Sequence, residues 1–226
     1  MFIYDSTYLL LIPAILISMW AQTKVNSTFN KYVRVKSYRG YSGAETARII
    51  LDSNGLSNVD IELTRGRLSD HYDPSKRVLR LSHDVYYGTS LASIGVAAHE
   101  CGHAIQHKVQ YGPLKLRSAS VPLANVGSNL SWIIFLLGLV FSIQPLVTAG
   151  IVLFAAVVIF QLITLPVEFD ASARALQQVR TAGILYDDEL VGAKKVLDAA
   201  AMTYIAAAIM AISQLIRLIA ISRRDD

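Results

Sequence analysis

Two long stretches that carry almost no charge constrain the fold of this chain more than any other feature. Residues 130–165 contain no Asp, Glu, Lys or Arg, and residues 1–21 contain only Asp5. A helix of about 20 apolar residues is long enough to cross the hydrocarbon core of a bilayer. The 226 residues are 53% hydrophobic, which exceeds the share usual in soluble domains. We therefore expect a mainly α-helical, multi-pass protein whose partner is the lipid bilayer of the cell membrane.

Four membrane-spanning segments are expected. Residues 1–23 form an N-terminal transmembrane anchor, residues 129–165 a transmembrane hairpin, and residues 199–226 a C-terminal transmembrane helix. We expect the anchor to be retained rather than cleaved as a signal peptide. No Lys or Arg precedes it, and Met19 stands where a small residue should precede the cleavage point. A transporter is disfavoured, because ionisable residues are nearly absent from the middle of these spans.

Charge returns between the anchor and the hairpin, so residues 24–128 are interpreted as a water-facing domain. Five basic residues of this segment precede its first acid, Glu45, and an excess of Lys and Arg is typical of cytoplasmic loops. We expect this domain to face the cytoplasm, together with residues 166–198, which the hairpin returns to the same side. The net charge of +4 comes from scattered residues rather than from one basic stripe, which argues against a nucleic-acid partner.

Helical signals mark the rest of the water-facing sequence. A capping box at residues 42–45 predicts a helix over 46–52, and apolar spacing predicts a long helix over about 90–110, ended by the glycine and proline that follow. A polar helix is expected over 166–181, and the acidic residues 187–189 are expected to form a loop.

Two short extended segments, 59–63 and 77–81, predict a small antiparallel β-sheet. Asp70, His71 and Asp73 lie between the two segments and are candidate ligands for a second metal. A plain turn is the simpler interpretation of these three residues.

The sequence His99-Glu-Cys-Gly-His103 is an HExxH motif inside the predicted helix 90–110. Four helical residues advance about 6 Å and return to nearly the same face, so both imidazoles can bind one Zn²⁺. Glu100 lies beside them, where it can take a proton from water activated at the metal. Two alternatives remain: histidines that make ordinary hydrogen bonds, and a metal site without catalysis. Cys101 is the only cysteine, which excludes a multi-cysteine zinc site, and it is expected to be a packing residue.

A catalytic zinc site needs a third protein ligand and an open position for water. His107 is an unsuitable ligand, because on a straight helix it lies about 12 Å from His99, whereas two nitrogens on one zinc are at most ~4 Å apart. It is expected beside the site, on the substrate side or on the surface. Glu168 and Asp170 directly follow the hairpin, which returns them to the side of the motif. From the residues alone, both carboxylates remain candidates.

The motif and its surroundings resemble a known family. The residues that carry the resemblance are 99–106, 68–74, 78–82 and 168–174. They are similar to the YugP-type neutral zinc metallopeptidases of bacterial membranes and, more distantly, to the HtpX and CAAX prenyl endopeptidase gluzincins. The resemblance implies a gluzincin-like α+β metallopeptidase core that holds one zinc ion. It also implies a sheet edge near the metal that pairs with the substrate backbone, and residues 78–81 are the candidate segment for this edge.

The same resemblance implies a choice between the two carboxylates. Gluzincins of this kind take their third ligand from the glutamate of a Glu-x-x-Ala-Asp motif, and that glutamate matches Glu168. Ser172 departs from the pattern, because the distant relatives carry there an aspartate that orients a histidine ligand. Asp170 is then the candidate substitute for that role.

These observations lead to one expected function and one alternative. The expected function is a zinc metalloendopeptidase, embedded in the membrane, that hydrolyses peptide bonds of membrane proteins or peptides. His99, His103 and Glu168 hold the metal in this hypothesis, and Glu100 is catalytic. The alternative is a catalytically inactive zinc-binding membrane scaffold or regulator. Glu100 favours the enzyme, because a metal site without turnover gains nothing from a general base.

Overall fold

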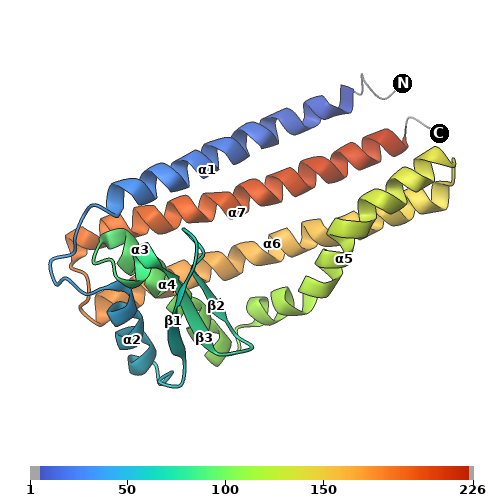
Figure 1. Ribbon diagram of the computed structural model, residues 1–226. Helices are drawn as coiled ribbons and strands as arrows, with labels where there is room; N and C mark the ends of the chain where they lie inside the picture. The colour runs from blue at the N-terminus through green and yellow to red at the C-terminus, as the bar shows by residue number, and fades with distance from the viewer. Residues whose placement is uncertain (1–5, 224–226) are drawn as a thin grey trace. The chain divides into compact units, whose positions relative to one another are not determined.

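The computed structural model describes residues 6–223, so the ends of the first and last expected spans, at residues 1–5 and 224–226, lie outside the described residues. The chain is mostly helical (Figure 1). In chain order its elements are η1 (Ser6–Leu11), α1 (Ile12–Tyr32), α2 (Gly43–Ser53), β1 (Asp60–Thr64), β2 (His71–Asp73), β3 (Val78–Ser82), α3 (His83–Tyr86), α4 (Leu91–Lys108), α5 (Gly112–Val140), α6 (Gln144–Thr181) and α7 (Asp187–Ser222).

The chain divides into two compact units. The first, which we call the helical unit, comprises Met1–Gln22, Lys115–Pro166 and Met202–Asp226. The second, which we call the mixed unit, comprises Thr23–Leu114 and Val167–Ala201 and contains the three strands found among residues 6–223.

Within residues 6–223, four helices are long and apolar enough to cross a membrane, the same number as the spans that the sequence predicts. They cover Thr7–Tyr32, Gly112–Val140, Gln144–Thr181 and Asp187–Ser222. The turn between α5 and α6 falls where the hairpin turn was predicted. Within the helical unit, Gly150 lets these two helices pack closely, because a Cβ there would lie 2.9 Å from the backbone nitrogen of Phe135. Small residues commonly allow such approach between membrane helices.

Arg217 places a charge within the last span, and the helical unit buries it. Its side chain is 4% exposed, its guanidinium lies 3.8 Å from the ring centroid of Tyr8, and its Nε donates a hydrogen bond of 3.2 Å to Thr7. An aromatic face and a hydroxyl thus stabilise a cation that would be costly in contact with lipid.

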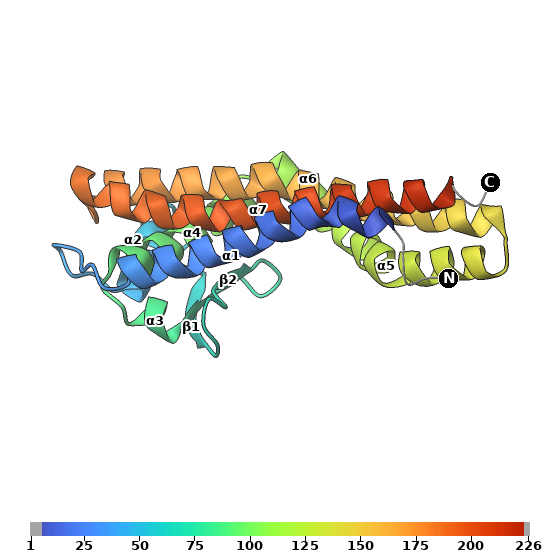
Figure 2. The same cartoon turned by 90° about the horizontal axis from the view of Figure 1, so that it is seen from above.

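The helix boundary expected at Pro166 is absent. The polar helix expected to begin at Pro166 is the second part of α6, which runs unbroken through that proline (Figure 1 and Figure 2). A proline removes one backbone hydrogen bond, but Val167, Ala171, Ala175 and Val179, spaced by four residues, are each at most 1% exposed. This buried stripe keeps the segment helical.

The acidic residues 187–189, expected as a loop, form the first turn of α7. Negative charge stabilises a helix N-terminus. The carboxylate of Glu189 also accepts hydrogen bonds from the backbone nitrogens of Tyr38 (2.7 Å) and Tyr186 (2.9 Å). The acids therefore begin the helix.

The sheet is mixed, so the prediction of an antiparallel sheet was wrong. Its strand order is β1-β3-β2, with β1 parallel to β3 and β2 antiparallel to β3. Residues 71–73 form a strand instead of part of a turn, so the chain reverses twice between β1 and β3 and these two strands run in the same direction. The expected substrate edge at 78–81 is also wrong, because β3 is the central strand and pairs on both sides.

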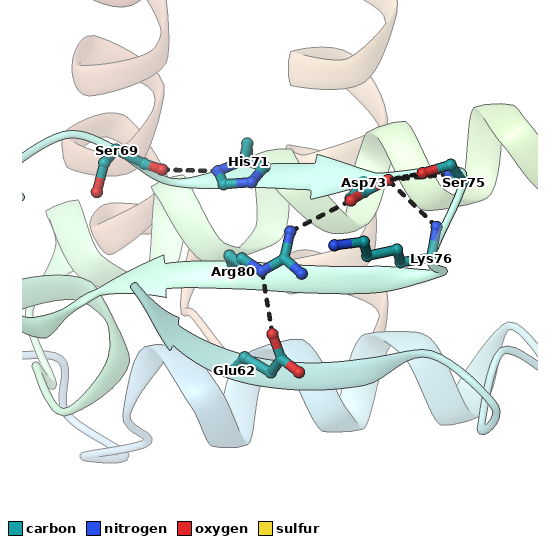
Figure 3. Close-up of polar contacts among 7 residues, drawn as sticks. All are labelled: Glu62, Ser69, His71, Asp73, Ser75, Lys76 and Arg80. Atoms are coloured by element: carbon teal, nitrogen blue, oxygen red, sulfur yellow. Dashed lines mark hydrogen bonds and ion pairs between the residues drawn. The ribbon is translucent and has the colours of Figure 1, made fainter. Parts of the chain in front are cut away.

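A central arginine ties the three strands together. Arg80 on β3 contacts Glu62 on β1 (Nε to Oε2, 3.0 Å) and Asp73 on β2 (Nη1 to Oδ2, 3.2 Å), as Figure 3 shows. Asp73 also accepts hydrogen bonds from the hydroxyl of Ser75 (2.6 Å) and from the backbone nitrogens of Ser75 and Lys76. These donors, the Ser75 hydroxyl first, hold the pKa of Asp73 well below its usual range. Asp73 is thus engaged in the sheet.

The core of the mixed unit packs α4 against α2 and the sheet. The capping box is confirmed: Ser42 Oγ accepts from the Glu45 backbone nitrogen (3.2 Å), and the Glu45 carboxylate accepts from the Ser42 nitrogen (2.8 Å). Cys101 is fully buried on α4, with its sulfur 3.7 Å from the carbonyl oxygen of Ala47 on α2. Burial raises the pKa of this thiol far above its usual range, in keeping with a packing role.

Candidate metal centre

Helix α4 carries the HExxH motif and has a well-defined start. Ser90 caps it, since its Oγ accepts a hydrogen bond of 3.1 Å from the backbone nitrogen of Ser93. His99 and His103 lie one turn apart on this helix, with ring centroids separated by 4.8 Å and ring planes at 86°. Both side chains are 13% exposed. The imidazoles therefore face one small volume at the surface of the helix.

Glu168 on α6 completes this volume from the opposite side. Its Oε2 lies 3.3 Å from Nε2 of His99 and 3.5 Å from Nε2 of His103, and the residue is 2% exposed. Zinc–ligand bonds of about 2.0–2.1 Å in tetrahedral geometry place two ligand atoms about 3.3 Å apart. The donor types and these separations fit a zinc ion.

The three ligand atoms lie within 4.8 Å of one another, and His99, His103 and Glu168 are the one such group of three within residues 6–223. Asp70, His71 and Asp73 form no comparable group in the described part of the chain.

The surroundings of His103 act on its pKa in opposite directions. Burial alone would lower the pKa of His103, but the hydrogen bond to Glu168 and the charge of Glu100 raise it, and the net direction is upward.

Each histidine is oriented through its other ring nitrogen. Nδ1 of His99 lies 3.1 Å from Oγ of Ser172, and Nδ1 of His103 lies 3.0 Å from Oε1 of Gln106. An N–H held in this way leaves Nε2 free for a metal, and such partners are usual around ligating histidines. Both Nε2 atoms accordingly point toward Glu168.

Asp170 contributes through Gln106 rather than at the cluster itself. The Gln106 amide nitrogen donates to Oδ2 of Asp170 (2.8 Å) and to the carbonyl oxygen of Val167 (2.8 Å), and Arg174 donates to the same Asp170 oxygen at 2.6 Å. Gln106 is fully buried. Ser172, which departs from the pattern of the distant relatives, itself contacts His99, whereas Asp170 reaches His103 only through Gln106. Gln106 was not foreseen, although its position three residues after His103 places it on a neighbouring face of the helix.

Glu100 lies on α4 beside His99 and is 8% exposed. Within the described residues, its carboxylate makes no hydrogen bond or ion pair. Its charge is felt by Asp70, whose pKa is raised mainly by burial and further by Glu100. Asp70 is itself fixed by the backbone nitrogen of Ser82 (2.7 Å) and by the Ser82 hydroxyl (3.0 Å). The Glu100 carboxylate is thus available to a water molecule.

Gly102 brings the two ligand-bearing helices together. A Cβ at this position would lie 2.5 Å from the carbonyl oxygen of Ala171 on α6 and 3.1 Å from its Cα. Any side chain would therefore force α4 away from α6. The close approach that this glycine permits is what allows Glu168 to reach the histidines.

We expect Gly102→Ala to destabilise the protein by about 1–3 kcal/mol, because an added methyl group overpacks the contact with Ala171, and to lower zinc occupancy. Chemical denaturation and metal analysis measure the two effects. Gly112→Ala is the matched control, since a Cβ there meets nothing within 4 Å. Equal stability and equal zinc content in the two variants would contradict this reading of the helix contact.

His107 lies outside the ligand cluster. Its Nδ1 is 2.9 Å from the hydroxyl of Tyr72 on β2. His71 also lies apart, exposed, with its Nδ1 2.8 Å from the carbonyl oxygen of Ser69.

Comparison with known proteins identifies the family of this chain. The family model described as "Putative neutral zinc metallopeptidase" matches residues 7–223. The chain belongs to this family. A family relative, "Putative membrane protease YugP" of Bacillus subtilis (strain 168), is 50% identical over 219 residues, which are 96% of this chain and 97% of the relative. No solved structure gives a significant match. The family, the name of this relative and the four apolar helices together support a protease-like membrane protein of the zinc peptidase class.

Proposed function

We propose that this protein is a zinc-dependent endopeptidase in which His99, His103 and Glu168 hold one zinc ion and Glu100 is the general base. The observation that carries the proposal is the convergence of three ligand atoms within 4.8 Å, next to a buried carboxylate that no described residue engages. The core is accordingly gluzincin-like in its ligand set. Two histidines and a glutamate, with an open fourth position, are the ligands of known catalytic zinc sites.

The chain's own residues then have defined tasks. Ser172 and Gln106 hold the histidine Nδ1 atoms at 3.1 Å and 3.0 Å, which fixes the tautomer and the ring orientation. Glu100 takes the proton of the attacking water and passes it to the leaving amine, so that the carboxylate is regenerated when the peptide bond breaks. Zinc, when bound, polarises the scissile carbonyl and makes water a stronger nucleophile.

The substrates that fit this setting are membrane proteins or peptides at the bilayer surface of the cell membrane. The excess of basic residues after the first span supports a site that faces the cytoplasm. Strand β2 lies at the edge of the sheet and contacts α4 through Tyr72 and His107. The outer edge of β2, instead of β3, is the strand along which an extended peptide substrate can pair by strand addition.

Removing the metal tests the proposal most directly. We expect a chelator to reduce cleavage of an unfolded protein to the uncatalysed background, because the histidines and Glu168 alone cannot polarise a carbonyl. Stoichiometric Zn²⁺ should restore the rate. Cleavage that persists after metal analysis shows complete zinc removal would contradict the assignment.

A further inference from the structure

A second set of polar side chains surrounds a cavity beside α4, beyond the ligand cluster. The cavity has a volume of about 340 Å³ and lies within the mixed unit. Arg77, His107 and Lys108 line it, whereas no aspartate or glutamate of the described part of the chain is among its lining residues. Leu56 and Ala104, both buried, contribute an apolar base. We call this cavity the basic pocket.

The basic pocket offers a hydrogen-bond donor whichever tautomer its histidine adopts. Tyr72 also lines it, and the Tyr72 hydroxyl lies 2.9 Å from Nδ1 of His107. If the hydroxyl donates, Nε2 of His107 carries the proton and is a donor. If Nδ1 donates, the tyrosine hydroxyl is the free donor. Burial raises the pKa of Tyr72, whereas the positive charge of Arg77 acts to lower it. The Arg77 guanidinium therefore lies close enough to influence the Tyr72 hydroxyl.

Two positions of this lining carry polar side chains where the backbone favours glycine. Arg77 has φ 53° in the turn before β3, and Gln110 has φ 54° directly after Val109, the C-cap of α4. The Tyr111 nitrogen donates to the Gln106 carbonyl oxygen (2.9 Å), which is the arrangement in which helices usually end on glycine. Left-handed backbone at other residues is strained and concentrates at functional sites. Both residues therefore adopt this backbone conformation at a cost in stability.

The pocket lies close to the ligand cluster along α4. His107 follows His103 by one helical turn, an advance of about 6 Å on the same face. An extended peptide advances about 3.3 Å per residue. A substrate whose scissile bond lies at the cluster would therefore bring a side chain about two or three residues away to the basic pocket.

We propose that the basic pocket is a specificity subsite that binds an acidic side chain of the peptide substrate. The inference rests on the proposed peptidase function and names its substrate class: peptides with Asp or Glu about two or three residues from the cleaved bond. Arg77 and Lys108 supply the positive charge, and the Tyr72–His107 pair supplies a directed donor. Hydrogen bonds between charged groups of this kind are the strong ones.

Binding and cleavage are measured separately to test this. The full-length, zinc-loaded Glu100→Gln protein in detergent micelles is titrated with a fluorescent unstructured peptide containing several central glutamates, and with its glutamine counterpart. We expect the glutamate peptide to bind about tenfold more tightly. Arg77→Gln should remove most of this preference. Lys76→Gln is the matched control, because it removes one charge from the same turn and Lys76 does not line the pocket.

Arg77→Gly distinguishes a binding role from a structural one. Glycine adopts the left-handed backbone without strain, so this variant should unfold at the same or a higher temperature while losing the preference for the glutamate peptide. Equal affinity for the two peptides in the Glu100→Gln protein would overturn the subsite. A preference that survives in Arg77→Gln would overturn it as well.

The outcome for the subsite is separable from the outcome for catalysis. If the protein with Glu100 intact cleaves neither peptide although the Arg77-dependent preference is present, the peptidase proposal fails and the anionic subsite stands. If it cleaves both at equal rates and binds both equally, the subsite fails and the peptidase stands. Equal affinity for the peptides combined with Arg77-dependent binding of phosphatidylglycerol vesicles would assign the pocket to a lipid headgroup and overturn the proposal.

Discussion

Replacing Glu100 by glutamine is expected to abolish peptide cleavage while zinc remains bound. Glutamine has nearly the same shape as glutamate but cannot accept the proton of the attacking water. General acid–base catalysis contributes about 10²–10⁴-fold to a rate, so the loss should be of at least that order. Zinc content should be unchanged, because the donors of His99, His103 and Glu168 are untouched. Cleavage of a fluorescent unfolded protein and metal analysis of the same sample measure both quantities.

The control for this variant is Glu62→Gln, which neutralises a half-exposed carboxylate in the same unit, remote from the histidines in sequence. It should retain cleavage and zinc. If Glu100→Gln cleaves as fast as the unmodified protein, Glu100 is not the base. If neither protein cleaves although both hold zinc, the inactive zinc-binding scaffold or regulator becomes the better description.

Replacing Glu168 by alanine is expected to remove zinc, and activity with it. Its Oε2 is the atom that closes the cluster, at 3.3 Å and 3.5 Å from the two imidazole nitrogens, and two histidines alone hold zinc weakly. Asp170→Ala removes only the partner of Gln106 and Arg174. Loss of such supporting contacts typically weakens metal binding about 10–100-fold, so the Glu168 variant should lose more than this. Competition with a fluorescent zinc chelator gives both affinities.

Folding must be monitored alongside these affinities, because both acids lie on α6. Thermal unfolding of the metal-free proteins, compared with that of the unmodified chain, shows whether either variant has lost its structure. A larger loss of zinc affinity in Asp170→Ala than in Glu168→Ala, with both variants folded, would reassign the third ligand to Asp170.

The parts of this site that could be predicted from the sequence are those encoded locally. The histidine pair needs only a helix and a spacing of four residues, and α4 supplies both. Glu168 needed the family resemblance, because the residues alone left Asp170 equally open. Ser172 and Gln106 could not be assigned in advance, since a hydrogen bond to a particular ring nitrogen depends on how closely α4 and α6 approach at Gly102.

The fold errors have a similar physical origin. Strand β2 has three residues, all of them polar or aromatic, so no alternation of apolar residues marked it. Because the prediction lacked this strand, it gave the wrong direction of β1 relative to β3. The continuity of α6 through Pro166 depends on a stripe of buried small residues that only tertiary packing reveals. Segment length and charge were sufficient to predict four helices that are long and apolar enough to span a bilayer, because lipid imposes the same requirement on each of them.

The order of the ligands along the chain bears on how the protein is made. Both histidines are translated before α5, whereas Glu168 lies beyond the membrane hairpin. Ala193 of α7, which packs at 3.5 Å from the Cβ position of Gly95 on α4, comes later still. A nascent chain still lacking α6 therefore holds the motif without its carboxylate partner. Under the proposed function, peptidase activity therefore requires that synthesis has passed residues 129–165 and reached Glu168.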